Sequence, residues 1–208
     1  PVVRRITAPG FLHPGESKMK HVMIDIEAMD NKPTAAIASI AAAIFDPISG
    51  EVSASMYRRI AIESSEAFGG TLGAETIKWW FKQSGEVRAE VIKEGAYSLP
   101  VALSELNMFI LEYCDLASVK VWARGTDYDM PIIYNALRAV DLKPVWNFWN
   151  VRDVRTVEEV ALTVWGYASN RLVDPEKHNA AADVWNQIAQ LSDNLKSLAA
   201  KGAMGAAL

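Results

Sequence analysis

Apolar and polar residues alternate in the stretch 21–27, which predicts a half-buried β-strand. Val22, Ile24 and Ile26 alternate with Met23, Asp25 and Glu27. Side chains two residues apart in a strand point to the same face. Asp25 and Glu27 are therefore expected side by side on one face, with apolar neighbours around them.

Two further strands are expected after this one. Residues 35–45 are apolar and rich in alanine and isoleucine, and residues 46–50 (Asp-Pro-Ile-Ser-Gly) carry strong turn signals. Residues 51–60 have the pattern of a returning strand. Three strands joined by short turns predict an antiparallel meander.

The rest of the chain has mostly helical patterns. A short strand is expected at 119–123, and helices are expected at 74–83, 84–94, from 98 onward, 129–140, 151–164 and 179–200. Strands followed by helices with an inserted strand predict an α/β fold with a mixed central sheet flanked by helices.

Composition supports a single domain with a sizeable core, since the 208 residues are 50% hydrophobic and 22% charged. We expect residues 1–20, with their prolines and glycines, to form a loosely held arm. Residues 21–200 would form the domain, and 201–208 a tail. The net charge of −4 provides no global basic field, so any nucleic-acid binding must rest on a local site.

The cellular compartment is indicated by what the sequence lacks. Cys114 is the single cysteine, which excludes an internal disulfide and fits a reducing compartment, and its apolar surroundings predict a core position. The chain has no run of 18 apolar residues and no apolar leader at its start. We therefore expect a cytoplasmic protein without a membrane span.

The paired carboxylates Asp25 and Glu27 have two interpretations. Carboxylates that share an apolar site repel each other and lose hydration, which is costly unless a cation compensates. No Lys or Arg lies between Lys20 and Lys32, and oxygen ligands of this kind suit Mg²⁺ or Mn²⁺. The alternative is an edge strand whose polar face contacts water. The alternation alone supports both.

Two other segments carry polar residues near predicted element ends. Asp129 closes the segment 125–129, just past the strand at 119–123, and ligands favour the carboxyl ends of strands in open α/β sheets. By itself Asp129 is also typical of a helix N-cap or first turn. His178 and Asp183 flank the start of the last helix. They converge only if His178 precedes the helix, because five residues subtend about 500° on an ideal helix.

The order of three short motifs is more specific than any one of them. The motifs are Ile-Asp-Ile-Glu at 24–27, Gly-Thr-Asp-Tyr-Asp at 125–129 and His-Asn-Ala-Ala-Ala-Asp at 178–183. With them the sequence resembles the DEDDh 3′–5′ exonucleases, the DnaQ-like branch of the ribonuclease H-like fold, over roughly residues 20–195. The segments 77–84, 121–129 and 152–156 resemble the exonuclease VIII and phage exonuclease group in particular.

This resemblance implies a role for each matched residue. Asp25, Glu27 and Asp183 would bind metal directly, Asp129 would serve a second metal, and His178 would be the general base. Asp127 competes with Asp129 for the role of middle acid, but the family usually has an aromatic residue just before that acid.

The same resemblance implies an activity. Two divalent ions, Mg²⁺ or Mn²⁺, would support hydrolysis of phosphodiester bonds from the 3′ end of DNA or RNA, with release of nucleoside 5′-monophosphates. The chain departs from many relatives at Ala28, Met29 and Asp30, where they have small polar residues and glycine. How the backbone there meets the terminal nucleotide is left open.

Further residues are candidates for contacts with the substrate. Trp79 and Trp80 are adjacent helical positions and cannot both face inward, so one of them is a candidate for stacking on bases. A core position is the alternative for these rings, as for most of the tryptophans. Tyr128 precedes the middle acid, and Arg124 and Arg155 lie near the acids in sequence. Surface ion pairs are the alternative for both arginines.

A rival to the enzyme is a catalytically silent nucleic-acid-binding or scaffolding module on the same fold. The presence of all five expected site residues favours the enzyme. The expected partner is single-stranded DNA or RNA with a free 3′ end. The sequence leaves the choice between DNA and RNA, the preference for duplex ends and the oligomeric state, a homodimer included, undecided.

Overall fold

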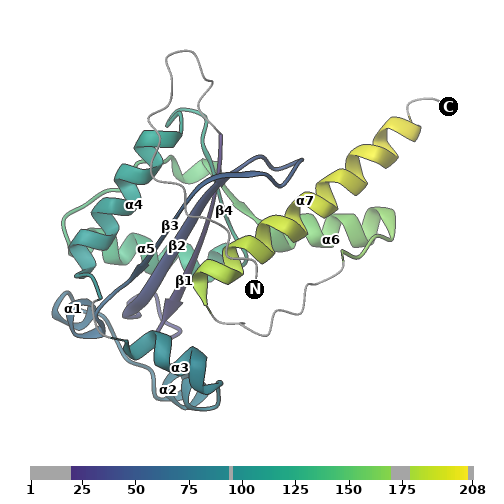
Figure 1. Cartoon of the computed structure of the whole chain (residues 1–208). Coiled ribbons are helices and arrows are strands. Elements are labelled where there is room, and N and C mark those ends of the chain that lie inside the picture. The colour runs from purple at the N-terminus through teal and green to yellow at the C-terminus, as the bar shows by residue number, and fades with distance from the viewer. Residues whose placement is uncertain (1–19, 94–95, 170–178, 206–208) are drawn as a thin grey trace.

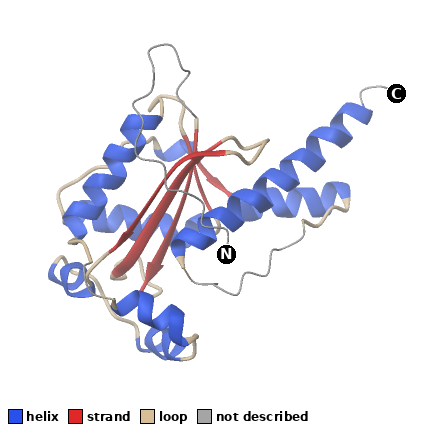
Figure 2. Ribbon diagram, viewed as in Figure 1, coloured by secondary structure: helices blue, strands red, loops and turns tan. Residues whose placement is uncertain are grey.

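The structure is a computed structural model that describes residues 20–93, 96–169 and 179–205. Five strands form one sheet in the order β3-β2-β1-β4-β5. The strands are β1 (His21–Ala28), β2 (Ile37–Phe45), β3 (Val52–Arg59), β4 (Lys120–Ala123) and β5 (Val151–Asp153). Figure 2 shows this sheet in red between helices.

Strand β1 lies in the middle of the sheet. It pairs antiparallel with β2 and parallel with β4, while β2 pairs antiparallel with β3 and β4 parallel with β5. The expected meander and mixed sheet are thus confirmed. Because β1 has a neighbour on each side, the interpretation of Asp25 and Glu27 as residues of a solvated edge strand is wrong.

Helices cover both faces of the sheet (Figure 1). On one face lie α4 (Leu99–Tyr113) and α5 (Thr126–Ala139), and on the other α6 (Val154–Trp165) and α7 (Ala180–Gly205). Helices α2 (Ala74–Phe81) and α3 (Gly85–Ile92) lie at the end of the sheet where β1 ends, near the start of α7.

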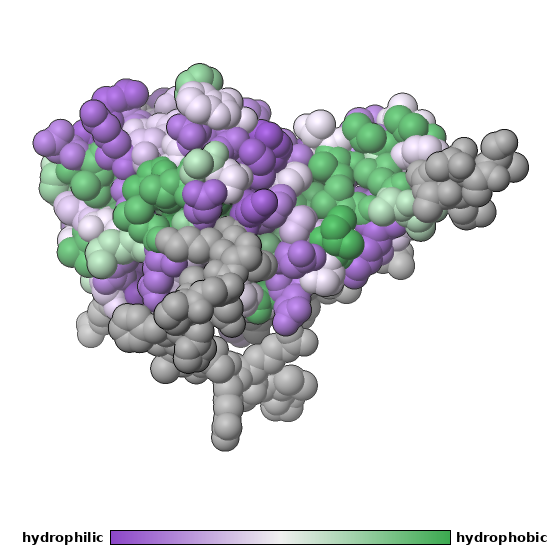
Figure 3. Space-filling model, turned by 90° about the horizontal axis from the view of Figure 1, so that it is seen from above, coloured by the Kyte–Doolittle hydropathy of each residue, from purple (hydrophilic) through white to green (hydrophobic). Residues whose placement is uncertain are grey.

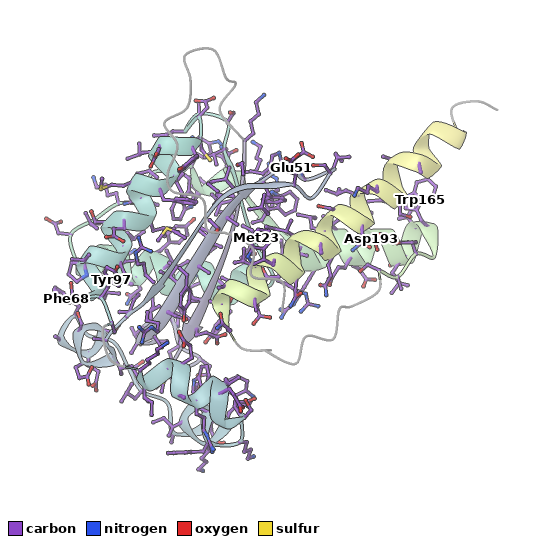
Figure 4. All side chains as sticks on the ribbon, viewed as in Figure 1. Met23, Glu51, Phe68, Tyr97, Trp165 and Asp193 are labelled. Carbon is purple, nitrogen blue, oxygen red and sulfur yellow. The ribbon has the colours of Figure 1, made fainter. Side chains whose placement is uncertain are left out.

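The alternation along β1 decides which core each side chain enters. Its even-numbered residues, such as Ile24, pack with α4 and α5 in the larger apolar cluster. Met23 packs with Ile188 of α7 on the other face, and Figure 4 shows it between the sheet and that helix. Asp25 and Glu27 follow Met23 at two-residue spacing, so they point to the face that α7 covers.

Helices α6 and α7 project together beyond the sheet. Figure 4 places Trp165 of α6 and Asp193 of α7 on this projecting end, and Figure 3 shows apolar residues gathered on its upper surface. The Tyr167 hydroxyl, just after α6, donates a hydrogen bond of 2.6 Å to Asp193 Oδ2. This bond joins the chain after α6 to α7.

Several elements differ from the sequence-based expectations. The helix expected at 129–140 begins at Thr126, and the helix expected at 151–164 begins at Val154, because its first three residues pair with β4 as β5. A short helix α1 (Ile62–Ala67) was not expected. Helix α7 continues to Gly205, beyond the expected end at 200.

Two expectations about burial can be compared with the structure. Cys114 lies in the larger apolar cluster, as its surroundings predicted. Among the described residues, no helix combines the length and the apolar content that crossing a membrane would need.

Candidate active site

Three carboxylates from two distant parts of the chain meet where α7 crosses β1. Oxygen atoms of Asp25, Glu27 and Asp183 all lie within 4.8 Å of one another. Asp183 sits in the first turn of α7, which Asn179 caps by accepting the backbone N–H of Ala181 at 3.0 Å. The packing of α7 on the odd-numbered face of β1 therefore creates the cluster.

The protonation of these carboxyls reflects burial and mutual repulsion. Burial, with the nearby charges of Asp129, Glu27 and Asp183, raises the pKa of Asp25 well above its usual value. Burial, followed by the charges of Asp183 and Asp129, raises the pKa of Glu27 to about 8. A nearby cation would offset both effects, because it stabilises the deprotonated form of these carboxyls.

Asp129 lies beside this cluster and Asp127 does not. Because α5 begins at Thr126, the two acids are two positions apart on a helix and point in different directions. Asp129 is buried, while Asp127 is exposed. Burial raises the pKa of Asp129 to about 7, although hydrogen bonds from the backbone N–H groups of Ile26 and of Asp129 itself act to lower it.

Gln187 is a site residue that the sequence reasoning missed. It lies one helical turn after Asp183, and its Nε2 donates a hydrogen bond of 2.6 Å to Asp25 Oδ1. Its side chain is buried, and among the described residues its Oε1 has no partner. The signal that was available is the four-residue spacing from Asp183, which places both side chains on one face of the helix.

Asp153 is a second missed residue, and it organises the loop that leads to Asp129. Its carboxylate accepts hydrogen bonds from the N–H groups of Gly125 and Thr126, from the Thr126 hydroxyl and from the Arg155 N–H, at 2.8–3.2 Å. Gly125 has φ +104°, which side chains disfavour. The start of α5 is therefore fixed by the end of β5.

The arginines differ in how free they are to bind a phosphate. Arg124 forms a two-point ion pair with Glu158, at 3.4 Å from Nε and 3.2 Å from Nη2. Arg155 is exposed beside Gly125, and its charge acts to lower the pKa of Asp129. Arg155 is thus a cation that lies near Asp129.

Tyr128 and Asp30 fasten the end of β1. The Tyr128 hydroxyl donates to the backbone oxygen of Asp30 at 3.1 Å, and burial raises the pKa of Tyr128 to about 12. The buried Asp30 carboxylate accepts the Thr71 hydroxyl at 2.8 Å and the Asn31 N–H at 2.8 Å. Within the segment Ala28, Met29 and Asp30, where the chain departs from many relatives, Asp30 is therefore an acid with a structural role.

The two adjacent tryptophans have different environments. Trp80 is buried in a small apolar cluster, and its indole N–H donates to the backbone oxygen of Ala28 at 3.2 Å. Trp79 is 38% exposed. Of this pair, only Trp79 has the exposed face that stacking on a base requires.

His178 lies outside the described residues, so its geometry is not part of the structure. The next residue, Asn179, lines a narrow crevice with Glu27, Ser39, Tyr57, Glu90 and Val91. His21 has another role: its Nδ1 accepts the indole N–H of Trp122 at 2.9 Å at the start of β1.

Comparison with known proteins gives three kinds of match. Residues 20–194 match the family described as the 3′-5′ exoribonuclease Rv2179c-like domain. An exodeoxyribonuclease of Enterobacteria phage T4 is 28% identical over 164 residues, which cover 68% of this chain and 72% of the phage protein.

Structures of E. coli exonuclease I have a similar fold. A zinc-bound complex with single-stranded DNA matches with a TM-score of 0.63 at 13% identity, over 85% of this chain and 40% of that one. A second exonuclease I structure matches with a TM-score of 0.60 at 14% identity, over 84% and 40%. This chain therefore spans about 40% of those exonuclease chains, and the likeness shows the ribonuclease H-like fold.

The family match covers β1, β4, the start of α5 and most of α7, which are the elements that bring the four acids together. By this match the chain belongs to the Rv2179c-like 3′–5′ exoribonuclease domain family.

Proposed function

We propose that this 3′–5′ exonuclease domain uses two divalent ions, Mg²⁺ or Mn²⁺, to remove nucleoside 5′-monophosphates from the 3′ end of single-stranded nucleic acid. The observation that carries the proposal is the cluster of Asp25, Glu27 and Asp183. The phage relative is named an exodeoxyribonuclease and the family an exoribonuclease, so both DNA and RNA are candidate substrates.

The residues fit divalent ions by their chemistry. Three carboxylates with converging oxygens and a fourth beside them supply the hard ligands that Mg²⁺ and Mn²⁺ prefer. Asp25, Glu27 and Asp183 would bind metal directly, and Asp129 would serve the second ion. When bound, such ions neutralise the phosphate and stabilise the charge that develops on the attacking and leaving oxygens.

The chain's own residues supply the proton transfer and the substrate contacts. We assign to His178 the role of general base that takes the proton from the attacking water, since its unperturbed pKa lies near 6.5. Support comes from Asn179, the next residue in the chain, which lines the same crevice as Glu27. Arg155 is exposed near Asp129 and would contact a substrate phosphate.

The defining experiment is digestion of 5′-labelled DNA and RNA oligonucleotides of one sequence, with free or blocked 3′ ends, in Mg²⁺ or Mn²⁺. We expect stepwise shortening from the free 3′ end, and none after Asp25→Asn. Oligonucleotide binding without release of any mononucleotide would support the catalytically silent module instead. Comparing the digestion rates of DNA and RNA identifies the preferred substrate.

The base is tested with His178→Ala. We expect the single-turnover rate to fall about 10²–10⁴-fold, the usual worth of a positioned general base. Metal affinity, measured by the metal-induced rise in melting temperature, should change little because the carboxylates remain. A variant that keeps the wild-type rate, or one that no longer responds to metal, would contradict the general-base role.

The middle acid is tested by comparing Asp129→Asn with Asp127→Asn. The first removes a buried charge beside the cluster, and the second removes an exposed one two residues away. We expect a large loss of turnover for Asp129→Asn and nearly wild-type turnover for Asp127→Asn. If Asp127→Asn loses more turnover than Asp129→Asn in the same digestion assay, Asp127 is the middle acid instead.

A further inference from the structure

The outer face of α2 carries aromatic and basic side chains that are exposed at the surface. On its inner face, Ile77 and Trp80 pack in the apolar cluster with Met29. On the outer side, Trp79 is 38% exposed and Phe81 is 70% exposed. A surface depression of about 560 Å³ is lined by Glu75, Lys78, Trp79, Phe81 and Lys82. We call these five residues the α2 surface.

The α2 surface is held at a fixed place relative to the acids. Trp80 donates its indole N–H to the backbone oxygen of Ala28, the residue after Glu27. The Gly73 N–H, at the N-cap of α2, donates to the backbone oxygen of Met29 at 2.7 Å. Figure 1 shows α2 and α3 at the end of the sheet where β1 ends. The surface therefore lies at the same end of the molecule as the cluster.

The chemistry of this surface matches a single nucleic-acid strand. Exposed aromatic faces stack on bases of any sequence, and lysines contact the backbone phosphates. Glu75, Lys78, Trp79 and Lys82 recur at helical spacing along one stripe, with two lysines and one glutamate. Lys78 contacts Glu75 at 3.1 Å in an exposed pair, and Lys82 has no ion pair within the described ranges.

From this arrangement we infer that the α2 surface binds the unreacted part of a single strand whose 3′ end occupies the acid cluster. The inference rests on the proposed function and adds the location of the strand. Bases stack on Trp79 and Phe81, while Lys78 and Lys82 contact phosphates. Contacts made far from the reacting bond strengthen binding of longer substrates. The enzyme therefore prefers long single strands to dinucleotides.

The first experiment measures binding apart from catalysis. Fluorescence anisotropy in EDTA, with labelled single strands about 12 nucleotides long, compares the wild type with Trp79→Ala/Phe81→Ala and with Lys82→Glu. We expect the double variant to raise Kd about 10-fold or more, since base–aromatic stacking contributes this much. Lys82→Glu should also reduce the salt dependence of binding.

Matched controls lie at the opposite end of the sheet. Phe148 and Trp149, just before β5, form an edge-to-face pair with ring centroids 5.0 Å apart and are 75% and 61% exposed. Phe148→Ala/Trp149→Ala and Lys143→Glu therefore remove exposed groups of the same kinds away from the acids. We expect both controls to bind the strand like the wild type. Melting temperatures check that every variant is folded.

The second experiment measures the preference for length. The ratio of kcat/KM for the long strand to kcat/KM for a dinucleotide should fall in Trp79→Ala/Phe81→Ala and stay constant in the control. Unchanged Kd in the double variant, an equal loss in the controls, or a change in oligomeric state caused by the substitutions would overturn the inference. If the wild type binds the strand through α2 but digests nothing, the proposed function fails and the binding surface stands.

Discussion

At the residue scale, Gln187 shows how one neutral side chain supports a cluster of charges. Its hydrogen bond is the influence that lowers the pKa of Asp25, against burial and three neighbouring carboxylates that raise it. The bond also restrains the Asp25 carboxylate. We therefore regard Gln187 as a positioning residue that acts through Asp25.

This role predicts the behaviour of Gln187→Leu. Loss of the hydrogen bond should weaken divalent-metal binding about 10–100-fold, the usual effect of removing a partner of a metal ligand. Titration calorimetry with Mn²⁺ measures this directly. Gln190→Leu is the control, because Gln190 is also buried on α7 with an unpartnered Oε1 among the described residues. Equal losses in both variants would indicate a general effect on α7 packing.

The paired tryptophans make the same point about neighbours. Trp79 and Trp80 are chemically identical and adjacent, yet one contacts the Ala28 backbone in the core and the other is at the surface. Their different roles follow from the direction in which α2 packs on Met29. The residue type alone does not determine which of the two tryptophans is buried.

At the element scale, the end of β5 holds the junction between β4 and α5 in place, and this junction leads to Asp129. Asp153 ends β5 and caps α6, and the same carboxylate binds the N–H groups that open α5. A Cβ on Gly125 would lie 2.7 Å from Arg155 Nη1, and its φ of +104° disfavours any side chain. The glycine therefore allows Arg155 to lie over the start of α5.

We predict that Gly125→Ala reduces exonuclease activity out of proportion to its loss of stability. The left-handed backbone costs about 1–2 kcal/mol with a side chain, and the contact with Arg155 must also rearrange beside Asp129. Gly166→Ala is the control, since Gly166 caps α6 with φ +62° and has open space around it. Urea unfolding should show comparable losses, and only Gly125→Ala should lose turnover per folded molecule.

At the scale of the whole molecule, the acid cluster opposes folding when no metal is bound. Glu27 has a pKa of about 8 in the folded state against 4.5 as its ordinary value, so the folded chain binds more protons between these pH values. The free energy of unfolding must then fall as pH rises across that window. Hydrogen bonds lower the pKa values of Asp30 and Asp46, and their contribution is lost only in more acidic solution.

We predict that the metal-free protein unfolds more easily at pH 8 than at pH 5, by on the order of a few kcal/mol. Mn²⁺ should stabilise the protein more at pH 8, because it binds deprotonated carboxylates. Thermal or urea unfolding in EDTA and in Mn²⁺ at both pH values measures this. Asp25→Asn should reduce the pH dependence in EDTA. A metal-free protein that gains stability toward pH 8 would contradict the electrostatic account of the cluster.

Local rules were sufficient for much of this protein. The two-residue period of a strand places Asp25 and Glu27 on one face whatever lies around them, and apolar stretches with turn signals indicated the meander. The order of the acids along the chain indicated the family. These features depend on residues close in sequence, so they can be inferred without a structure.

Tertiary packing decided the rest. The crossing of α7 over β1 brought Asp183 and Gln187 to Asp25, and the pairing of only three residues with β4 turned the start of an expected helix into β5. Beginning α5 at Thr126 separated the buried Asp129 from the exposed Asp127. Each outcome depends on contacts between segments far apart in sequence. The free energy of such contacts depends on which surfaces the fold buries together, and this cannot be inferred from local sequence patterns.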